Sequence, residues 1–242
     1  MKLSIIICAY NEQDTIMTVL ENVRVVDLGT GWEREIIVVD NCSTDGTREL
    51  LQDLDWPEAR VIFHPRNLGK GTSVRTAIAH CTGDYAIIQD ADLEYDPAEY
   101  TLFLERIAGD HPAAIYGSRT LGGRAVYEYA ANYWGVRFLT GLTNLLYGAH
   151  LTDVATAAKM VRVDVLKSLN LTGTGFDLDF ELTDKILRAG YEIVETPVSY
   201  RPRTIAEGKK IRAWDGLWAL KIITRDRLLP MSRIVKIEGE DQ

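Results

Sequence analysis

The chain of 242 residues is 46% hydrophobic and 26% charged, and its formal net charge is -8. This composition is typical of a globular protein with a sizeable core, and the acidic balance argues against DNA or RNA as a partner. The three cysteines show no metal-site spacing, so we expect free thiols in a reducing cytoplasm and no disulfide framework.

Strands and helices are expected to alternate through the first half of the chain. Apolar runs predict strands at 3–8, 35–40, 60–64, 85–89 and 113–117. Apolar residues at helical spacing predict helices between them, at 13–26, 45–54, 71–80 and 97–108. Because the strands are apolar on both faces and are separated by helices, we expect a mostly parallel sheet with helical cover.

The second half is less regular. An aromatic-rich segment predicts one or two helices over 124–147, and a short strand is expected within 156–162. A helix over 176–189 is expected to end at Gly190, and a strand follows over 191–200. A polar loop over 203–216 then leads into a last helix over 214–229.

Polar clusters follow the expected strands at their carboxyl ends. "AYNE" (9–12) follows the first strand, "DNCSTDGT" (40–47) the second and "QDADLE" (89–94) the fourth. Ligands bind open α/β sheets outside the carboxyl ends of the strands, so we expect these clusters to line one crevice. "NLGKG" (67–71) follows the third strand, and the glycines beside Lys70 suit a close approach of the backbone to a phosphate.

The acidic cluster after the fourth strand suits a divalent cation. Asp90 and Asp92 share one side of an extended chain, and Glu94 follows two residues later. Like charges this close repel, so either water on an open surface or a bound cation must stabilise them. Carboxylate oxygens select Mg²⁺ or Mn²⁺, which usually also bind substrate phosphates. The cluster therefore predicts a metal site, with a solvated acidic loop as the alternative.

The clusters occur in an order that resembles the inverting nucleotide-sugar glycosyltransferases of family two. Further segments, "YGSR" (116–119), "LTDVATAAKMVR" (151–162) and "RTIAEGKKIRAWDG" (203–216), are similar to those of dolichol-phosphate mannose synthases and bacterial polyprenyl-phosphate glycosyltransferases. The resemblance implies the GT-A fold, a Rossmann-like, mostly parallel α/β sheet with helices on both faces and an acceptor-side extension. It implies one domain, 1–242, with a nucleotide-sugar-binding half (1–118), an acceptor-binding half (119–230) and a flexible polar tail (231–242).

The resemblance also implies an activity. A hexose would move from a nucleotide-sugar such as GDP-mannose or UDP-glucose to a polyprenyl or dolichyl phosphate at a membrane surface. The alternatives are transfer to a hydroxyl group of a glycan or small molecule, or nucleotide-sugar binding without catalysis. No stretch approaches the roughly 18 apolar residues that span a bilayer, so we expect a cytoplasmic protein, peripheral on the cytoplasmic membrane face. The last helix packs in the core or lies in the membrane interface.

Site residues follow from the same resemblance. It implies nucleotide-sugar binding by Ala9, Tyr10, Glu12, Asp40, Lys70, Asp90 and Ala91, with Asp40 at the nucleobase. It implies Mg²⁺ or Mn²⁺ binding by Asp92 and Glu94, and catalytic roles for Asp92, Asp153 and Arg119. It implies acceptor or diphosphate binding by Arg119, Arg137, Arg203, Lys209 and Lys210, the last three in a loop that forms either a lid or an ordinary solvated loop.

Asp153 has two expected roles, depending on the acceptor. A hydroxyl acceptor needs a general base, and Asp153 is the candidate. A phosphate acceptor is already ionised at neutral pH and needs none. Asp153 could otherwise cap a turn or pair with Arg162.

Overall fold

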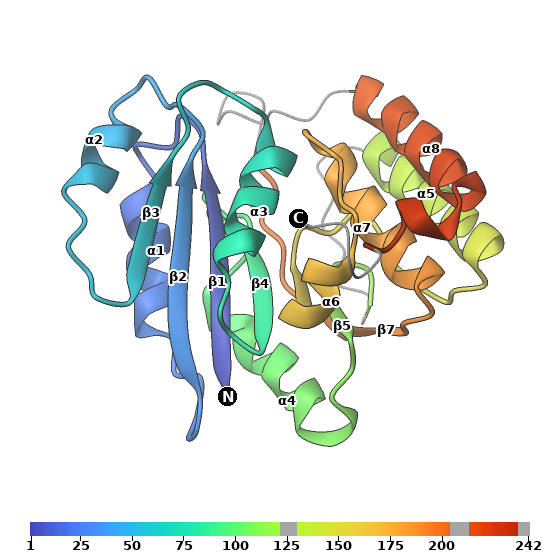
Figure 1. Ribbon diagram of the computed structural model, residues 1–242, viewed down its shortest axis with the longest axis horizontal. Coiled ribbons are helices and arrows are strands. Elements are labelled where there is room, and N and C mark those ends of the chain that lie inside the picture. The colour runs from blue at the N-terminus through green and yellow to red at the C-terminus, as the bar shows by residue number, and fades with distance from the viewer. Residues whose placement is uncertain (122–129, 204–212, 237–242) are drawn as a thin grey trace.

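A computed structural model describes residues 1–121, 130–203 and 213–236 (Figure 1). The strands of the first half are β1 (Lys2–Ala9), β2 (Glu33–Asp40), β3 (Ala59–Phe63), β4 (Tyr85–Asp90) and β5 (Ala114–Ser118). Its helices are α1 (Ile16–Val25), α2 (Thr47–Gln52), α3 (Lys70–His80) and α4 (Tyr100–Asp110), with a 3₁₀ turn at Pro97–Glu99. Every one of these strands begins and ends within two residues of its predicted bounds.

The described part of the second half contains β6 (Lys159–Arg162), β7 (Ile193–Pro197), α5 (Ala130–Tyr147), α6 (Val163–Ser168), α7 (Asp177–Arg188) and α8 (Ala213–Leu228). α7 ends one residue before its predicted bound, and Gly190 adopts the left-handed backbone expected after a helix (φ 85°). α6 was not predicted, because "VDVLKS" follows β6 without a polar break. The first residues of the predicted helix 124–147 lie outside the described part of the chain, as does most of the loop 203–216.

The strands form one sheet in the order β3-β2-β1-β4-β6-β5-β7. β6 runs antiparallel to β4 and β5, while the other pairs are parallel. The predicted fold class, a mostly parallel α/β sheet, is therefore confirmed. The parallel order places the carboxyl ends of β1, β2 and β4 at the same edge of the sheet.

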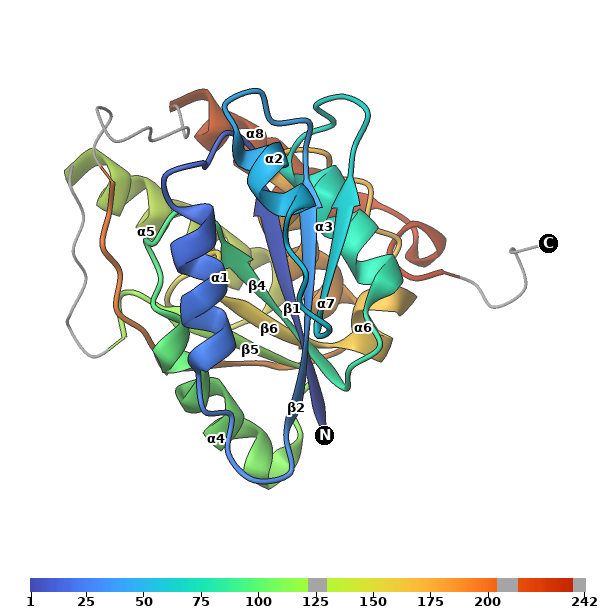
Figure 2. The same ribbon diagram turned by 90° about the vertical axis from the view of Figure 1, so that its left-hand side faces the viewer.

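Helices cover both faces of the sheet, as Figure 2 shows with α1 and α4 on one side and α3 and α6 on the other. Ile5 and Ile7 of β1 belong to the core under α1 and α4. Ile6 belongs to the opposite core, under α3, α6 and α7. Successive side chains of a strand point to opposite faces, so a sheet that is covered twice requires strands that are apolar throughout.

Residues 231–236 belong to the tail that the sequence predicts to be flexible, and they contact the domain. They include a 3₁₀ turn at Met231–Arg233. The side chain of Ile234 is fully buried, and its carbonyl accepts a hydrogen bond from Asn170 N–H (2.9 Å). An apolar side chain within the polar segment docks this part of the tail on the domain, while 237–242 lie outside the described residues. None of the described helices is long and apolar enough to cross a membrane.

Two carboxyl groups are buried where α7 packs against α8. Asp184 of α7 and Asp226 of α8 are fully buried, and neither oxygen of Asp184 has a hydrogen-bond partner among the described residues. Burial and the nearby Asp226 raise the pKa of Asp184 from 3.8 to about 8. Between these two pKa values, the folded state keeps a proton on Asp184 that the unfolded state loses. The contribution of Asp184 to the free energy of unfolding is therefore complete below about pH 4, and it declines as the pH rises to about 8.

We expect Asp184→Asn to raise the stability of the protein at pH 8 by about 1–3 kcal/mol, because asparagine carries no charge to desolvate. At pH 4 the substitution should change little, since the wild-type group is then protonated. Thermal unfolding between pH 4 and 8 measures both values, with the exposed Asp14→Asn as a control. If Tm falls equally steeply between pH 4 and 8 for the wild type and for Asp184→Asn, Asp184 is not the source of the pH dependence.

Candidate active site

The carboxyl ends of the central strands open on one cavity. Of the predicted site residues, it is lined by Ala9, Tyr10, Glu12, Lys70, Asp90, Ala91, Asp92, Glu94, Arg119 and Arg203. Asp40, Asp153 and Arg137 do not line it. Lys209 and Lys210 lie outside the described residues. The polar clusters that follow β1, β2 and β4 thus contribute to one cavity, as expected from their place at the ends of the strands. Arg119 and Arg203 reach the same cavity from the second half of the chain.

Hydrogen bonds tie the loop after β1 to the loop after β2. The backbone N–H of Asn11 donates to Ser43 Oγ (3.0 Å), and that of Thr44 donates back to Asn11 Oδ1 (2.9 Å). The N–H of Glu12 donates to Thr47 Oγ1 (2.9 Å). Short polar side chains that satisfy loop backbone groups explain the Asn, Ser and Thr residues of these motifs. Together the two loops form one wall of the cavity.

Asp40 and Asn41 lie at the end of β2 and have different surroundings. Asp40 is fully buried, and its Oδ2 lies 3.3 Å from a guanidinium nitrogen of Arg48. Asn41 lines the cavity, and its Oδ1 accepts a hydrogen bond from Leu68 N–H (2.8 Å), which fixes the loop before α3. The predicted role of Asp40 at the nucleobase stays a prediction, and Asn41 has a clear role in building the site.

Lys70, the first residue of α3, is a half-buried cation between two carboxylates. Its Nζ lies 2.7 Å from Asp90 Oδ1 and 3.9 Å from Asp179 Oδ2. Burial lowers the pKa of Lys70, but Asp90 and Asp179 raise it more, so its pKa lies well above the ordinary value. Lys70 therefore stays protonated and adds its charge to the positive end of the α3 dipole. Asp179 also lines the cavity and was not predicted. An acidic residue in the first turn of α7 was the feature of the sequence that could have indicated it.

The glycines beside Lys70 face protein backbone. A Cβ at Gly69 would lie 2.1 Å from the carbonyl oxygen of Thr174, and a Cβ at Gly71 would lie 2.7 Å from that of Gly173. The sequence suggested that these glycines admit a phosphate. Their missing side chains instead admit the loop at 173–174, which packs against the start of α3.

Gly71→Ala is expected to destabilise the fold by about 2–4 kcal/mol, because backbone atoms on both sides must shift. Gly109→Ala is the matched control, since a Cβ at this α4 position meets nothing within 4 Å. The control should be neutral or stabilising by about 0.5–1 kcal/mol. Denaturant unfolding measures both, and equal stabilities of the two variants would contradict the close packing.

The acidic cluster holds a guanidinium. Arg203 Nη2 lies 2.7 Å from Asp92 Oδ2, and its backbone N–H donates to Glu94 Oε1 (2.8 Å). Burial and the neighbouring carboxylates raise the pKa of Asp92 to about 7, although Arg203 opposes them. A solvated acidic loop is excluded, because the side chains of Asp92 and Glu94 are only 12% and 11% exposed.

The predicted metal ligands fit Mg²⁺ or Mn²⁺ in chemistry, since they are hard oxygen donors at the cavity. They are not gathered around a common point as ligands: within the described ranges, no three acidic, His or Cys side chains are placed to hold a metal ion. The side chain of Arg203 lies between them instead. Asp92 and Glu94 stay the predicted ligands of an ion at this cavity.

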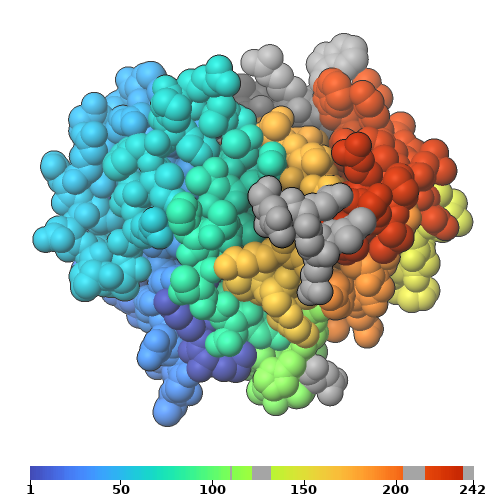
Figure 3. Space-filling view, in the orientation of Figure 1, coloured from blue at the N-terminus to red at the C-terminus, as the bar shows by residue number. Residues whose placement is uncertain are grey.

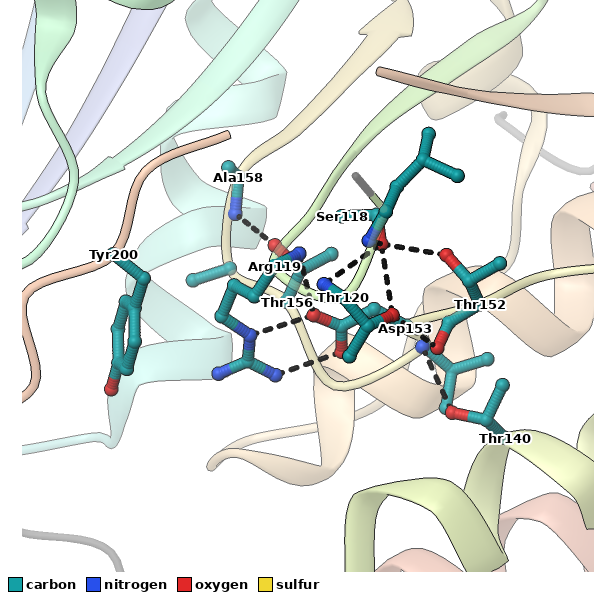
Figure 4. A network of polar contacts seen from close by, with 12 residues as sticks. Ser118, Arg119, Thr120, Thr140, Thr152, Asp153, Thr156, Ala158 and Tyr200 are labelled. Carbon is teal, nitrogen blue, oxygen red and sulfur yellow. Dashed lines mark hydrogen bonds and ion pairs between the residues drawn. The ribbon is translucent and has the colours of Figure 1, made fainter. Parts of the chain in front are cut away.

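A bidentate ion pair holds Arg119 at the cavity (Figure 4). Arg119 Nε and Nη2 donate to Asp153 Oδ2 (2.7 Å) and Oδ1 (2.8 Å), and the Arg119 backbone N–H also donates to Oδ2 (3.1 Å). Asp153 is fully buried. Because both of its oxygens accept from Arg119, the geometry favours orientation of Arg119 over proton abstraction. Arg162 pairs with Asp164 and not with Asp153.

Aromatic side chains that were not predicted complete the cavity. The ring centroids of Tyr200 and Tyr95 are 5.2 Å apart. The Cζ atom of Arg119 lies 5.0 Å from the ring centroid of Tyr200. Tyr200 Oη donates to Glu94 Oε2 (2.9 Å). Tyr200 follows β7 as the motifs follow the earlier strands, so the same strand-end rule could have found it. Arg137 is exposed on α5 and does not line the cavity.

Comparison with known proteins gives a consistent result. The model of a family described as "Glycosyl transferase family 2" matches residues 4–169. The chain is 28% identical over 195 residues to glycosyltransferase AglJ of Haloferax volcanii, covering 80% of this chain and 61% of AglJ. It is 27% identical over 215 residues to the dolichol-phosphate mannosyltransferase of Pyrococcus furiosus, covering 86% and 59%. The chain thus spans about three-fifths of the length of these relatives.

Solved structures share the fold. Glucosyl-3-phosphoglycerate synthase from Mycobacterium tuberculosis, in complex with Mg²⁺ and UDP, superposes with a TM-score of 0.71 at 20% identity. The match covers 95% of this chain and 80% of that chain.

Proposed function

Because the chain belongs to glycosyl transferase family 2 and has the expected GT-A fold, we propose that it transfers a hexose from a nucleotide-sugar to a polyprenyl or dolichyl phosphate, with inversion. The observation that carries the proposal is a cavity in which cations and carboxylates lie together. Lys70, Arg119 and Arg203 line it, and so do the carboxylates of Glu12, Asp90, Asp92, Glu94 and Asp179. The cations suit the diphosphate of a nucleotide-sugar, and the carboxylates suit the divalent cation that accompanies it.

The basic and the acidic residues of the cavity would have different roles. Lys70 and Arg119 would bind the diphosphate, and Asp153 keeps the Arg119 fork oriented before substrate arrives. Asp92 and Glu94 would hold Mg²⁺ or Mn²⁺, which when bound supplies charge stabilisation to the departing nucleoside diphosphate. Fixed cations in a mostly buried site stabilise developing negative charge without the reorganisation that water requires.

A phosphate acceptor fits this division of roles. Its oxygen is already ionised, so the site needs no general base, and Asp153 is engaged with Arg119. A hydroxyl acceptor is the second candidate, and one observation favours it: Asp179 is a carboxylate that lines the cavity. In that case Asp179, in addition to Asp153 as the sequence suggests, is a candidate base.

A membrane-bound acceptor is supported by an exposed apolar surface on α5 and α8. These helices pack together at one end of the molecule (Figures 1 and 3). Among the side chains that the structure describes on these helices, the exposed large apolar ones are Trp134, Phe138, Leu145, Leu217, Trp218 and Leu228. The other side of α8 is in the core, through Ala219, Ile222 and Ile223. Such an amphipathic arrangement, with the exposed Lys221 and Arg227 beside it, suits peripheral docking on a cytoplasmic membrane face.

The test is a transfer assay with Mn²⁺ and a panel of UDP- and GDP-hexoses. One arm contains polyprenyl phosphate in anionic vesicles, and the other contains soluble sugars with free hydroxyl groups. We expect labelled hexose in the lipid phase, and none after chelation of the metal. Product only in the soluble arm would favour the hydroxyl acceptor. No nucleotide release and no thermal shift with any donor would contradict an enzyme of this kind.

A further inference from the structure

We propose that Arg203 is a built-in counter-ion of the acidic cluster, which a divalent cation displaces, and that the displaced guanidinium then binds the diphosphate of the donor. This inference rests on the proposed function and deepens it. It assigns Arg203 two successive partners and makes metal and nucleotide binding depend on each other.

Carboxylates from two strand ends converge on the Arg203 guanidinium. Arg203 Nη1 lies 3.2 Å from Glu12 Oε2, and Nη2 lies 2.7 Å from Asp92 Oδ2. Arg203 Nε lies 3.8 Å from Glu94 Oε1. The four side chains are between 10% and 18% exposed. Arg203 therefore lies between these carboxylates, and while it is there the described side chains are not placed to share an ion.

The charges of this cluster match a divalent cation better than a guanidinium. The carboxylates of Glu12, Asp92 and Glu94 surround the one guanidinium of Arg203. Lys70, another cation that lines the cavity, is paired with Asp90 at 2.7 Å. An ion with two positive charges would improve the balance, because unscreened like charges are costly in a partly buried site.

The hydrogen bonds of the guanidinium are also incomplete. Arg203 Nε is buried and has no hydrogen-bond partner among the described residues, since 3.8 Å to Glu94 is too long for a hydrogen bond. A buried donor without a partner weakens the arrangement that contains it. Displacement of Arg203 by an ion therefore costs less than the loss of a fully satisfied ion pair.

The backbone next to Arg203 is anchored independently of its side chain. Tyr200 Oη donates to Glu94 Oε2 (2.9 Å), and Arg201 N–H donates to the Glu94 carbonyl (3.0 Å). These contacts keep residues 200–201 at the cavity when the Arg203 side chain turns away. Arg119, held against the Tyr200 ring, lines the same cavity, so a released guanidinium would join a cation that already faces the diphosphate.

The consequence is a coupling between the two ligands. Metal alone must compete with Arg203, whereas nucleoside diphosphate gives Arg203 a new partner and removes that competition. A nucleoside diphosphate should therefore tighten Mn²⁺ binding, and Mn²⁺ should tighten nucleotide binding by the same factor.

The experiment measures Mn²⁺ binding by electron paramagnetic resonance at pH 8, with and without UDP or GDP. In the absence of nucleotide, Arg203→Gln should bind Mn²⁺ at least about tenfold more tightly than the wild type, because no charged hydrogen bonds must be broken. Nucleotide should also tighten Mn²⁺ binding by a factor about tenfold smaller in Arg203→Gln than in the wild type. Arg203→Lys, which keeps the charge without the fork, should be intermediate.

Arg201→Gln is the matched control, because Arg201 is exposed and makes only backbone contact with Glu94; it should behave as wild type. Asp92→Asn should remove Mn²⁺ binding, which would show that the Mn²⁺ measured is bound at the acidic cluster. Equal Mn²⁺ affinities of the wild type and Arg203→Gln without nucleotide would overturn the inference and leave the proposed function intact. If no variant binds Mn²⁺ with or without nucleotide, the metal-dependent function fails and the inference fails with it.

Discussion

Asp92→Asn is expected to lower kcat/KM for hexose transfer by about 10²–10³-fold or more. Asparagine has nearly the same shape but loses the negative charge that would hold Mg²⁺ or Mn²⁺. The local turn should survive, because Asp92 Oδ1 accepts from Glu94 N–H (3.1 Å), and an asparagine oxygen can do the same.

Asp96→Asn is the matched control for this prediction. It makes the same chemical change four residues later, and Asp96 lies outside the lining of the cavity. Asp96 Oδ1 caps the following 3₁₀ turn by accepting from Ala98 N–H (3.0 Å), a role that asparagine fills equally well. Steady-state kinetics with varied Mn²⁺ compares the two variants. Equal activities of Asp92→Asn and Asp96→Asn would remove Asp92 from the mechanism.

Arg119→Gln should lower kcat/KM by about 10²–10³-fold, because a fixed donor fork to the diphosphate is lost. Asp153→Asn should act through Arg119. It leaves a buried guanidinium without its carboxylate, so we expect a loss of stability of about 3–5 kcal/mol and a smaller loss of activity. The double variant should be more stable than Asp153→Asn alone, since it removes the guanidinium together with the carboxylate that neutralises it.

Thermal unfolding and kinetics on both acceptor classes separate the two roles of Asp153. If Asp153 orients Arg119, its substitution affects transfer to phosphate and to hydroxyl acceptors alike, and it lowers Tm. If Asp153→Asn abolishes only hydroxyl transfer while Tm stays unchanged, Asp153 is the base that the sequence suggests.

The sequence was sufficient for the arrangement of the first half. Strands such as β1 and β2 are apolar on both faces, which only a doubly covered sheet satisfies, and each is followed by polar residues at the ligand-binding edge. The direction of β6 was not readable, because a strand of four residues carries little pattern. Its antiparallel pairing depends on the packing of neighbours that are distant in sequence.

The composition of the site was predictable, but the pairing of its charges was not. Sequence order gives no reason for Asp153 to select Arg119 over the nearer Arg162, or for Arg203 to lie against Asp92 across 111 positions. The glycines beside Lys70 show the same limit. A glycine indicates a close approach, and only the fold shows that the approaching group is the backbone at 173–174.

The most direct test of the account is a crystal structure of the protein with Mn²⁺ and UDP or GDP, with the ion located by its anomalous scattering. The account predicts Mn²⁺ bound to Asp92, the diphosphate against Lys70 and Arg119, and the Arg203 guanidinium moved from the carboxylates to the phosphates. A nucleotide bound outside this cavity, or an ion bound away from Asp92, would contradict it.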